Sequence, residues 1–148
     1  MKYPILIGEK VYLRPIEYED IDHGWLEWIN DLRISGNLNS PGFPTTKADL
    51  REYIDNSKPP NAVLFAICDK KDNRYIGNAK IDKIDWQNKK CTYGRLIGDV
   101  TQRRKGVGSE VVDLILKYAF INLGMNRVYT LLFNDNIGSI RSNEKAGM

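Results

Sequence analysis

The chain is poor in the residues that build metal and disulfide sites, with two cysteines and one histidine among 148 residues. Cys68 and Cys91 are too few and too far apart for a metal cluster or a secreted disulfide framework, so we expect reduced, buried thiols. The N-terminus has no basic region followed by a long apolar run, so it is not typical of a signal peptide. No apolar stretch approaches the roughly 20 residues that span a bilayer. We therefore expect a cytoplasmic protein with no metal and no membrane partner.

A strong charge of one sign is also missing. The net charge is +3, whereas domains that bind polyanions are usually more basic and interleave aromatic side chains with their cations. We therefore expect no nucleic-acid partner, although a small acidic ligand is compatible with this charge. Hydrophobic residues make up 42% of the chain and charged residues 28%, which fits one globular domain over residues 1–148 without a linker or repeat.

Short apolar runs and polar turns predict most of a sheet. Apolar and polar residues alternate over 11–16, and Pro15 at the end of this run predicts an edge strand. Three further strands, separated by polar turns and forming an antiparallel meander, are expected over 62–68, 74–84 and 91–98. A strand, helix and strand over 92–133 then add a parallel crossover. The predicted fold class is therefore α/β, with a mixed, mostly antiparallel sheet flanked by helices on both faces.

Two helices are expected between the first two of these strands. Acidic residues at 17–20 predict the start of the first helix, whose buried side would carry Ile21, Trp25, Leu26, Trp28 and Ile29. His23 lies in this helix without an evident metal or nucleophile partner, so we expect a surface or capping role for it. Residues 33–46 are rich in Ser, Gly, Asn and Pro and predict a loop, after which Thr45 or Thr46 caps a helix over 48–54.

A basic, glycine-bearing loop dominates the second half of the sequence. Residues 103–109 are Arg-Arg-Lys-Gly-Val-Gly-Ser, and the amphipathic helix that follows has an apolar stripe of Val111, Leu114, Ile115, Tyr118 and Ala119. Free N–H groups at a helix start, the helix dipole and nearby cations favour a bound anion, and glycines let the backbone approach it. The pattern predicts a phosphate-binding loop, with a solvated basic turn as the alternative.

The loop does not match two common phosphate motifs. A Walker A loop ends in Gly-Lys-Ser/Thr, and a Rossmann fingerprint needs a third glycine where Val111 stands. Arg103-x-x-Gly106-x-Gly108, between a strand and a long helix, instead resembles the acyl-CoA pyrophosphate loop of the GCN5-related N-acetyltransferases (GNATs). A second block is similar to the next strand and helix of that family, and it runs from Asn126-Arg127-Val128-Tyr129 through Asn134-Asp135-Asn136 to Glu144-Lys145-Ala146-Gly147. The resemblance is closest to the branch that includes ribosomal-protein and amino-sugar acetyltransferases.

The resemblance implies the acyl-CoA N-acyltransferase fold with acetyl-CoA as co-substrate. The N–H groups of residues 104–109 would hold the pyrophosphate, and the backbone of residues 97–99 would pair with the pantetheine like an added strand. Asn136 would contact the pantetheine arm, and a helix-capping role is compatible with this. The implied cofactor-binding residues are Ile97, Gly98, Asp99, Arg103, Arg104, Lys105, Gly106, Val107, Gly108, Ser109 and Asn136.

Catalysis would be direct attack of an amine on the thioester, and two positions depart from the family pattern. Asn143 stands where many relatives carry a tyrosine that protonates the leaving thiolate, and its amide can only donate a hydrogen bond. Thr92 stands where some relatives carry a glutamate, and it cannot act as a base. Asp82 or Asp85 is the candidate base, acting through water, with a solvated turn carboxylate as the alternative for each. We assign the catalytic roles to Asp85 and Asn143; Cys91 as a nucleophile is disfavoured because a thiol needs activation.

The end of the chain also departs from the family pattern. Relatives usually continue past a Gly-Phe that corresponds to Gly147-Met148, with two strands that complete the sheet. We therefore expect a domain that lacks its C-terminal strands, as a truncated sequence would. An uncovered sheet edge is an aggregation hazard, which favours a homodimer.

The function implied by the resemblance is transfer of an acetyl group from acetyl-CoA to a primary amine on a small molecule. A slight similarity of residues 86–98 to the sugar-acting relatives favours a nucleotide-linked amino sugar, and a protein N-terminal amine is the alternative acceptor. Asn143, Thr92 and the missing tail also leave open a non-catalytic CoA-binding module.

Overall fold

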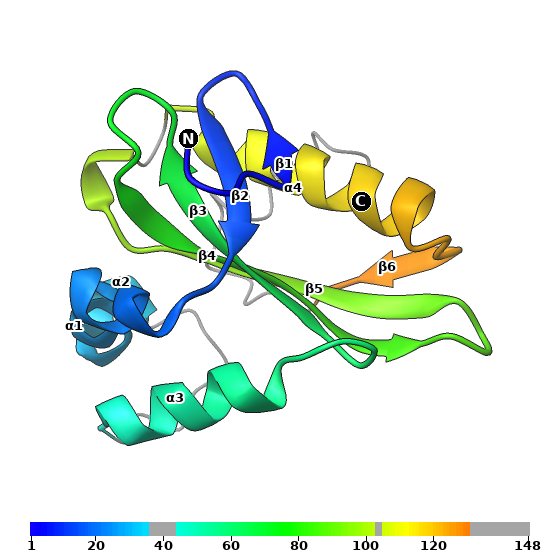
Figure 1. The fold of residues 1–148 in the computed structure, drawn as a ribbon, viewed down its shortest axis with the longest axis horizontal. Coiled ribbons are helices and arrows are strands. Elements are labelled where there is room, and N and C mark those ends of the chain that lie inside the picture. The colour runs from blue at the N-terminus through cyan, green and yellow to red at the C-terminus, as the bar shows by residue number, and fades with distance from the viewer. Residues whose placement is uncertain (36–43, 103–104, 131–148) are drawn as a thin grey trace.

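Six strands form a single sheet and occur in it in their order along the chain (Figure 1). The computed structural model describes residues 1–35, 44–102 and 105–130. The strands are β1 (Leu6–Ile7), β2 (Val11–Pro15), β3 (Val63–Asp69), β4 (Tyr75–Asp85), β5 (Lys90–Ile97) and β6 (Arg127–Tyr129). Neighbouring strands are antiparallel except β5 and β6, which are parallel. The mixed, mostly antiparallel sheet predicted from the sequence is confirmed.

The first predicted strand does not lie at the edge of the sheet. β2 pairs with β3 on one side and with the two residues of β1, Leu6 and Ile7, on the other. Pro15 suggested an edge because proline cannot donate to a ladder. It is the last residue of β2 and lies beyond the segment that pairs with β1, so it costs the sheet no hydrogen bond on that side.

Helices cover both faces of the sheet (Figure 1). α4 (Val107–Lys117) lies on one face, and α1 (Trp25–Asn30), α2 (Leu32–Ser35) and α3 (Lys47–Asn56) lie on the other. Two 3-10 helices, Tyr18–His23 and Val100–Gln102, and a π-helical turn, Tyr118–Asn122, complete the helical elements of the described ranges. Within these ranges, every helix is too short or too polar to cross a membrane.

The helix predicted to start at residues 17–20 is interrupted at Gly24. Gly24 has a φ of 129°, and this backbone conformation separates the 3-10 helix Tyr18–His23 from α1. A Cβ at Gly24 would lie 2.5 Å from the indole of Trp28, so this bend requires glycine. α2 then occupies the start of the segment predicted as a loop, and residues 36–43 of that segment lie outside the described ranges.

α3 begins at the predicted cap. The Thr46 hydroxyl accepts a hydrogen bond from the Asp49 N–H at 3.1 Å, and the Asp49 carboxylate accepts one from the Thr46 N–H at 2.9 Å. This reciprocal pair is a capping box. The hydrogen bonds from Thr46 hold the pKa of Asp49 below its usual value. The cap fixes the start of α3, so Leu50 and Ile54 are buried toward the sheet.

α4 is held on its face by packing and by one carboxylate. Its apolar stripe packs against strand residues in a core that includes Leu13, Phe65, Ile67, Ala79, Ile81, Val111, Val112 and Ile115. The Glu110 carboxylate accepts hydrogen bonds from the N–H groups of Glu9, Lys10 and Val11 at 2.6–3.1 Å. Glu9 and Lys10 lie in the turn between β1 and β2 and Val11 begins β2, so Glu110 ties the first turn of α4 to the sheet.

Candidate active site

The predicted phosphate loop leads into a helix start that no side chain caps. Gly106 precedes α4 with a left-handed backbone of φ 80° and ψ 4°. The first bond of the helix runs from the Glu110 N–H to the Gly106 carbonyl at 3.1 Å. The N–H groups of Val107, Gly108 and Ser109 therefore lie in the turn that has no acceptor within the helix. With the helix dipole, they present a site for an anion.

The loop is held in place by Lys10. Its ammonium donates to the Lys105 carbonyl at 2.7 Å. A Cβ at Gly106 would lie 2.7 Å from the same ammonium, and the φ of 80° would strain any other residue. Lys10 comes from the turn that Glu110 binds, so both contacts fix the loop relative to the sheet. Glycine is required here by the backbone and by the space.

The second half of β5 has a backbone edge that pairs with no other strand among the residues the structure describes. β6 pairs only with the start of β5, over residues 90–92, and no strand of the described residues continues the pairing. The Gly98 N–H donates to the Ile76 carbonyl of β4 at 3.0 Å. Because N–H groups alternate in direction along a strand, that of Ile97 points away from β4. An extended chain can therefore add to β5 at this edge.

Most of the predicted cofactor-binding residues lie together at the end of β5 and the start of α4. Ile97 faces the open edge, whereas the N–H groups of Gly98 and Asp99 already bond to the Ile76 carbonyl, at 3.0 and 3.3 Å. The Asp99 carboxylate also pairs with Arg74 at 2.6 Å. Of residues 97–99, Ile97 is therefore the one whose N–H is directed toward this edge, where a pantetheine arm could accept it. Arg103, Arg104 and Asn136 lie outside the described residues.

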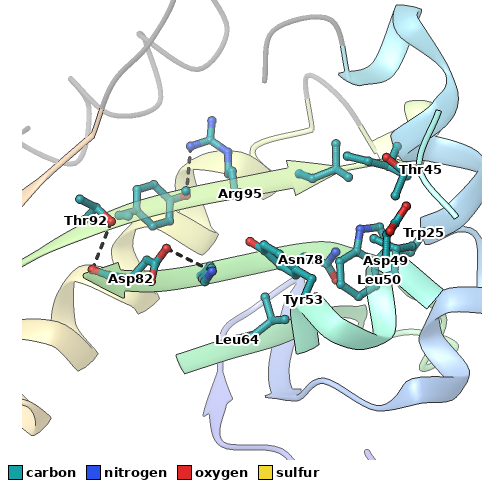
Figure 2. A pocket seen from close by; sticks show the side chains of 15 residues that line it. Trp25, Thr45, Asp49, Leu50, Tyr53, Leu64, Asn78, Asp82, Thr92 and Arg95 are labelled. Atoms are coloured by element: carbon teal, nitrogen blue, oxygen red, sulfur yellow. Dashed lines mark hydrogen bonds and ion pairs between the residues drawn. The ribbon is translucent and has the colours of Figure 1, made fainter. Parts of the chain in front are cut away.

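A cavity of about 480 Å³ lies against β4 and β5 on the face opposite α4 (Figure 2). Trp25 and Ile29 of α1 form one wall, and Leu50 and Tyr53 of α3 form another. Figure 2 shows the Tyr53 hydroxyl directed inward over the strands. The cavity is therefore a partly open cleft with apolar and aromatic walls, and a row of its polar groups lies on the strand floor.

The floor is a row of polar residues on β4. Asn78, Lys80 and Asp82 line the cavity, whereas the alternate residues Ala79 and Ile81 are buried on the α4 side. Facing the row across the β4–β5 ladder are Leu96 opposite Asn78, Gly94 opposite Lys80 and Thr92 opposite Asp82. Alternate residues of a strand share one face, so the sequence Asn-Ala-Lys-Ile-Asp produces this separation directly.

Lys80 and Asp82 form an ion pair on the floor. Their N–O distance is 3.1 Å, and the Lys80 ammonium lies 4.2 Å from the centroid of the Tyr53 ring. The other Asp82 oxygen accepts a hydrogen bond from the Lys83 N–H at 2.8 Å. The Asp82 side chain is 40% exposed and that of Lys80 only 16%. Asp82 is thus an accessible carboxylate in a cavity that can hold an amine.

Asp85, the predicted base, does not line this cavity. The β4–β5 register shifts between Asp82 and Asp85, and Lys83 has a φ of 49°, so strand alternation ends after Asp82. Both Asp85 oxygens accept hydrogen bonds from Asn88, at 3.0 and 2.9 Å. These bonds lower the pKa of Asp85 and make it a weaker base. The geometry favours Asp82 over Asp85, and Asn143 lies outside the described residues.

The two cysteines are free and buried, as predicted. Burial raises the pKa of both the Cys68 and Cys91 thiols, which is the opposite of what a nucleophile requires. Cys91 belongs to the core under α4 and does not line the cavity. The Thr92 hydroxyl donates a hydrogen bond to the Asp82 carbonyl at 3.1 Å and so links β5 to β4 at Asp82. Nothing in this geometry favours a cysteine nucleophile.

Sequence reasoning missed three residues of the cavity. Lys80, Gly94 and Tyr53 carry no motif, and each becomes visible only when α3 is placed over β4 and β5. One signal was available for Lys80, because Asn78, Lys80 and Asp82 are polar at alternate positions of a strand expected to have helices on both faces. Polar residues on a covered face indicate a cavity or a buried network.

The start of α4, the open edge of β5 and the cavity together fit an acyl-CoA ligand. The helix start with its required glycine suits a pyrophosphate, and the open edge suits an extended amide-bearing arm. The cavity is lined by residues 92–96 of β5, which directly precede Ile97 at that edge. The residues present therefore match the donor that the sequence predicted.

Comparisons with known proteins agree with this fit. A model of the acetyltransferase (GNAT) domain matches residues 10–148. The SPbeta prophage-derived uncharacterized N-acetyltransferase YokL of Bacillus subtilis (strain 168) is 30% identical over 141 residues, which cover 95% of this chain and 76% of that protein.

Solved structures show the same fold. The spermidine N-acetyltransferase from Vibrio cholerae, in complex with CoA and spermine, superposes with a TM-score of 0.84 at 17% identity, over 95% of this chain and 81% of that one. RimL, a ribosomal L7/L12 alpha-N-protein acetyltransferase in complex with coenzyme A, gives a TM-score of 0.83 at 15% identity, over 97% of this chain and 82% of that one.

Proposed function

The chain belongs to the GNAT family of acetyltransferases and transfers an acetyl group from acetyl-CoA to an amine, and we propose that Asp82 is the base that deprotonates the acceptor ammonium. The observation that carries this proposal is an accessible carboxylate on the floor of a partly open cavity, on the strand that pairs with β5. Asp82 takes the proton directly or through one water, which frees the nitrogen lone pair for attack.

The chain positions the two reactants rather than forming a covalent intermediate. Bound acetyl-CoA supplies an activated thioester, whose carbonyl carbon bonds to the amine nitrogen as the sulfur leaves. The N–H groups of Val107, Gly108 and Ser109 hold the pyrophosphate, and the edge of β5 at Ile97 orients the arm toward the cavity. Lys10 and Glu110 fix the loop and the start of α4 against the sheet, because Lys10 donates to the Lys105 carbonyl and Glu110 accepts from the Val11 N–H of β2.

The acceptor we favour is an amino sugar carried on a nucleotide. The similarity of residues 86–98 to sugar-acting relatives supports it, as does the mixture of apolar walls and a few polar groups in the cavity. A protein N-terminal amine is the second acceptor, supported by the structural similarity to RimL. Competition between a nucleotide-linked amino sugar and a peptide with a free N-terminus separates the two. Acetylation of the peptide alone would overturn the sugar proposal.

Calorimetric titration with acetyl-CoA tests the donor site. Gly106→Glu places a carboxylate at the anion site, and we expect acetyl-CoA affinity to fall about 100-fold, or about 2.7 kcal/mol. Gly124→Glu is the matched control, because Gly124 has a similar φ of 70° and a Cβ there meets nothing within 4 Å. Equal affinity in both variants would contradict the assignment of the loop.

A further inference from the structure

Lys80 places a cation beside the proposed base, at the centre of the cavity floor. An ammonium carries three N–H donors. In the described part of the chain, its contacts are the ion pair with Asp82 at 3.1 Å and the face of the Tyr53 ring at 4.2 Å. Its side chain is mostly buried, with 16% of its surface exposed. A donor directed into a ligand cavity and short of acceptors is a recognition group.

The strand opposite leaves room for a ligand at this cation. Gly94 faces Lys80 across the β4–β5 ladder, and a Cβ built on it meets nothing within 4 Å. Any larger residue at this position would project over the floor between Leu96 and Thr92. The open space therefore lies across the ladder from Lys80, in the cavity that Asp82 also lines.

The charge balance of the cavity argues against a polycation. Its charged lining residues within the described ranges are Asp49, Asp82, Lys80 and Arg95, which sum to no net charge. Asp49 lies at the rim, where its carboxylate accepts the Thr46 N–H in the cap of α3. When the reactive amine of a polycation is at Asp82, a second ammonium group would lie close to Lys80, and the two like charges repel.

We propose that the acceptor carries an anionic group, a carboxylate or a phosphate, a few bonds from its reactive amine, and that Lys80 binds this anion while Asp82 receives the amine. The proposal rests on the acetyl transfer described above and names the chemistry of its acceptor. The Lys80–Asp82 pair matches a molecule with both charges, because each residue exchanges its neighbour for the opposite charge of the ligand. Before the acceptor binds, the face of the Tyr53 ring contacts the Lys80 ammonium and holds it over the cavity floor.

Matched acceptors test the proposal with acetyl-CoA at saturation. Glucosamine 6-phosphate against glucosamine isolates a phosphate, β-alanine against β-alaninamide isolates a carboxylate, and spermidine represents a polycation. We expect kcat/KM to be about 10- to 100-fold higher for the anionic member of at least one pair, the usual range for a charge-assisted hydrogen bond. The pair that shows the preference identifies the anion.

Three variants assign the preference to Lys80. Lys80→Met should bring the ratio of anionic to neutral kcat/KM close to one, and Lys80→Arg should keep a ratio above one. Lys117→Met makes the same substitution at an exposed position of α4 and should leave the ratio at the wild-type value. A change in folding alone would alter both members of a pair together.

Several results would overturn the inference. A neutral amine used as well as its anionic partner in both pairs, or spermidine used best of all, would refute it while leaving acetyl transfer intact. A preference that survives Lys80→Met would place the anion elsewhere. Acetyl-CoA binding without acetylation of any amine would refute the acetyl transfer itself.

Discussion

The two faces of β4 carry different chemistry, although they belong to the same strand. On the α4 side, Ala79 and Ile81 are fully buried in an apolar core. On the other side, Asn78, Lys80 and Asp82 line a cavity under α1 and α3. One face therefore stabilises the fold, and the other leaves polar groups where a reaction needs them.

This comparison shows how a covered sheet can be read for function. Both faces lie beneath helices, so solvent alone does not explain the polar one (Figure 1). Burying polar groups without partners costs free energy, and a protein keeps them where they bind a ligand or one another. Neighbouring residues of β4 should therefore differ in what they affect. Residues facing α4 should control stability, and residues facing the cavity should control turnover.

Ile81→Ala should give the largest effect on the α4 face. Ile81 has no exposed surface, and truncating a buried isoleucine costs about 2–5 kcal/mol because a cavity remains. We expect the free energy of unfolding in urea to fall by about 3 kcal/mol. In the absence of urea, where the variant is folded, kcat for acetyl transfer should stay within about twofold of the wild-type value. Ile81→Val is the matched control and should cost about 1 kcal/mol. A large loss of kcat in the folded variant would break the separation of the two faces.

Glu110→Ala should give a smaller loss of stability. Removing this carboxylate leaves the N–H groups of Glu9, Lys10 and Val11 without their acceptor. We expect the free energy of unfolding in urea to fall by about 2 kcal/mol, since water partly replaces the lost hydrogen bonds of the exposed turn. Asp113→Ala, on the exposed side of the same helix, should change the unfolding free energy little. Equal losses in the two variants would show that the turn does not depend on Glu110.

The sequence predicted the parts of the fold that depend on local patterns. The strands of the meander, the Thr46 cap and the glycine loop before α4 follow from alternation, side-chain capping and backbone freedom. The break at Gly24 could not be predicted, because it depends on the contact of its backbone with Trp28. β1 was missed because its pairing involves only two residues.

The candidate site was predicted less completely than the fold. The loop motif predicted a donor site, whereas nothing in the sequence gave a reason to prefer Asp82 to Asp85 as the base. The choice depends on the register shift after Asp82 and on the left-handed Lys83, which turn Asp85 away from the row. Such irregularities follow from tertiary pairing and leave no clear periodic signal.

Gly94→Val should produce the smallest change in free energy of these variants. It should affect acceptor binding on the cavity face and leave stability unchanged. The side chain enters open space and favours a strand, so the free energy of unfolding should not decrease. The new methyl groups occupy the floor opposite Lys80, and we expect KM for the acceptor to rise about tenfold, or about 1.4 kcal/mol. Acetyl-CoA affinity measured by calorimetry should stay near the wild-type value. An unchanged acceptor KM would mean that the acceptor binds elsewhere.

The most direct measurement compares kcat for acetyl transfer in Asp82→Asn and Asp85→Asn at saturating acetyl-CoA and acceptor. The two residues lie close together at the end of β4, but only Asp82 lines the cavity. Loss of a general base costs about 10²- to 10⁴-fold, so we expect at least a 100-fold fall for Asp82→Asn and less than twofold for Asp85→Asn. The reverse pattern, or equal rates in the two variants, would contradict the assignment of the polar row on β4 as the reacting face.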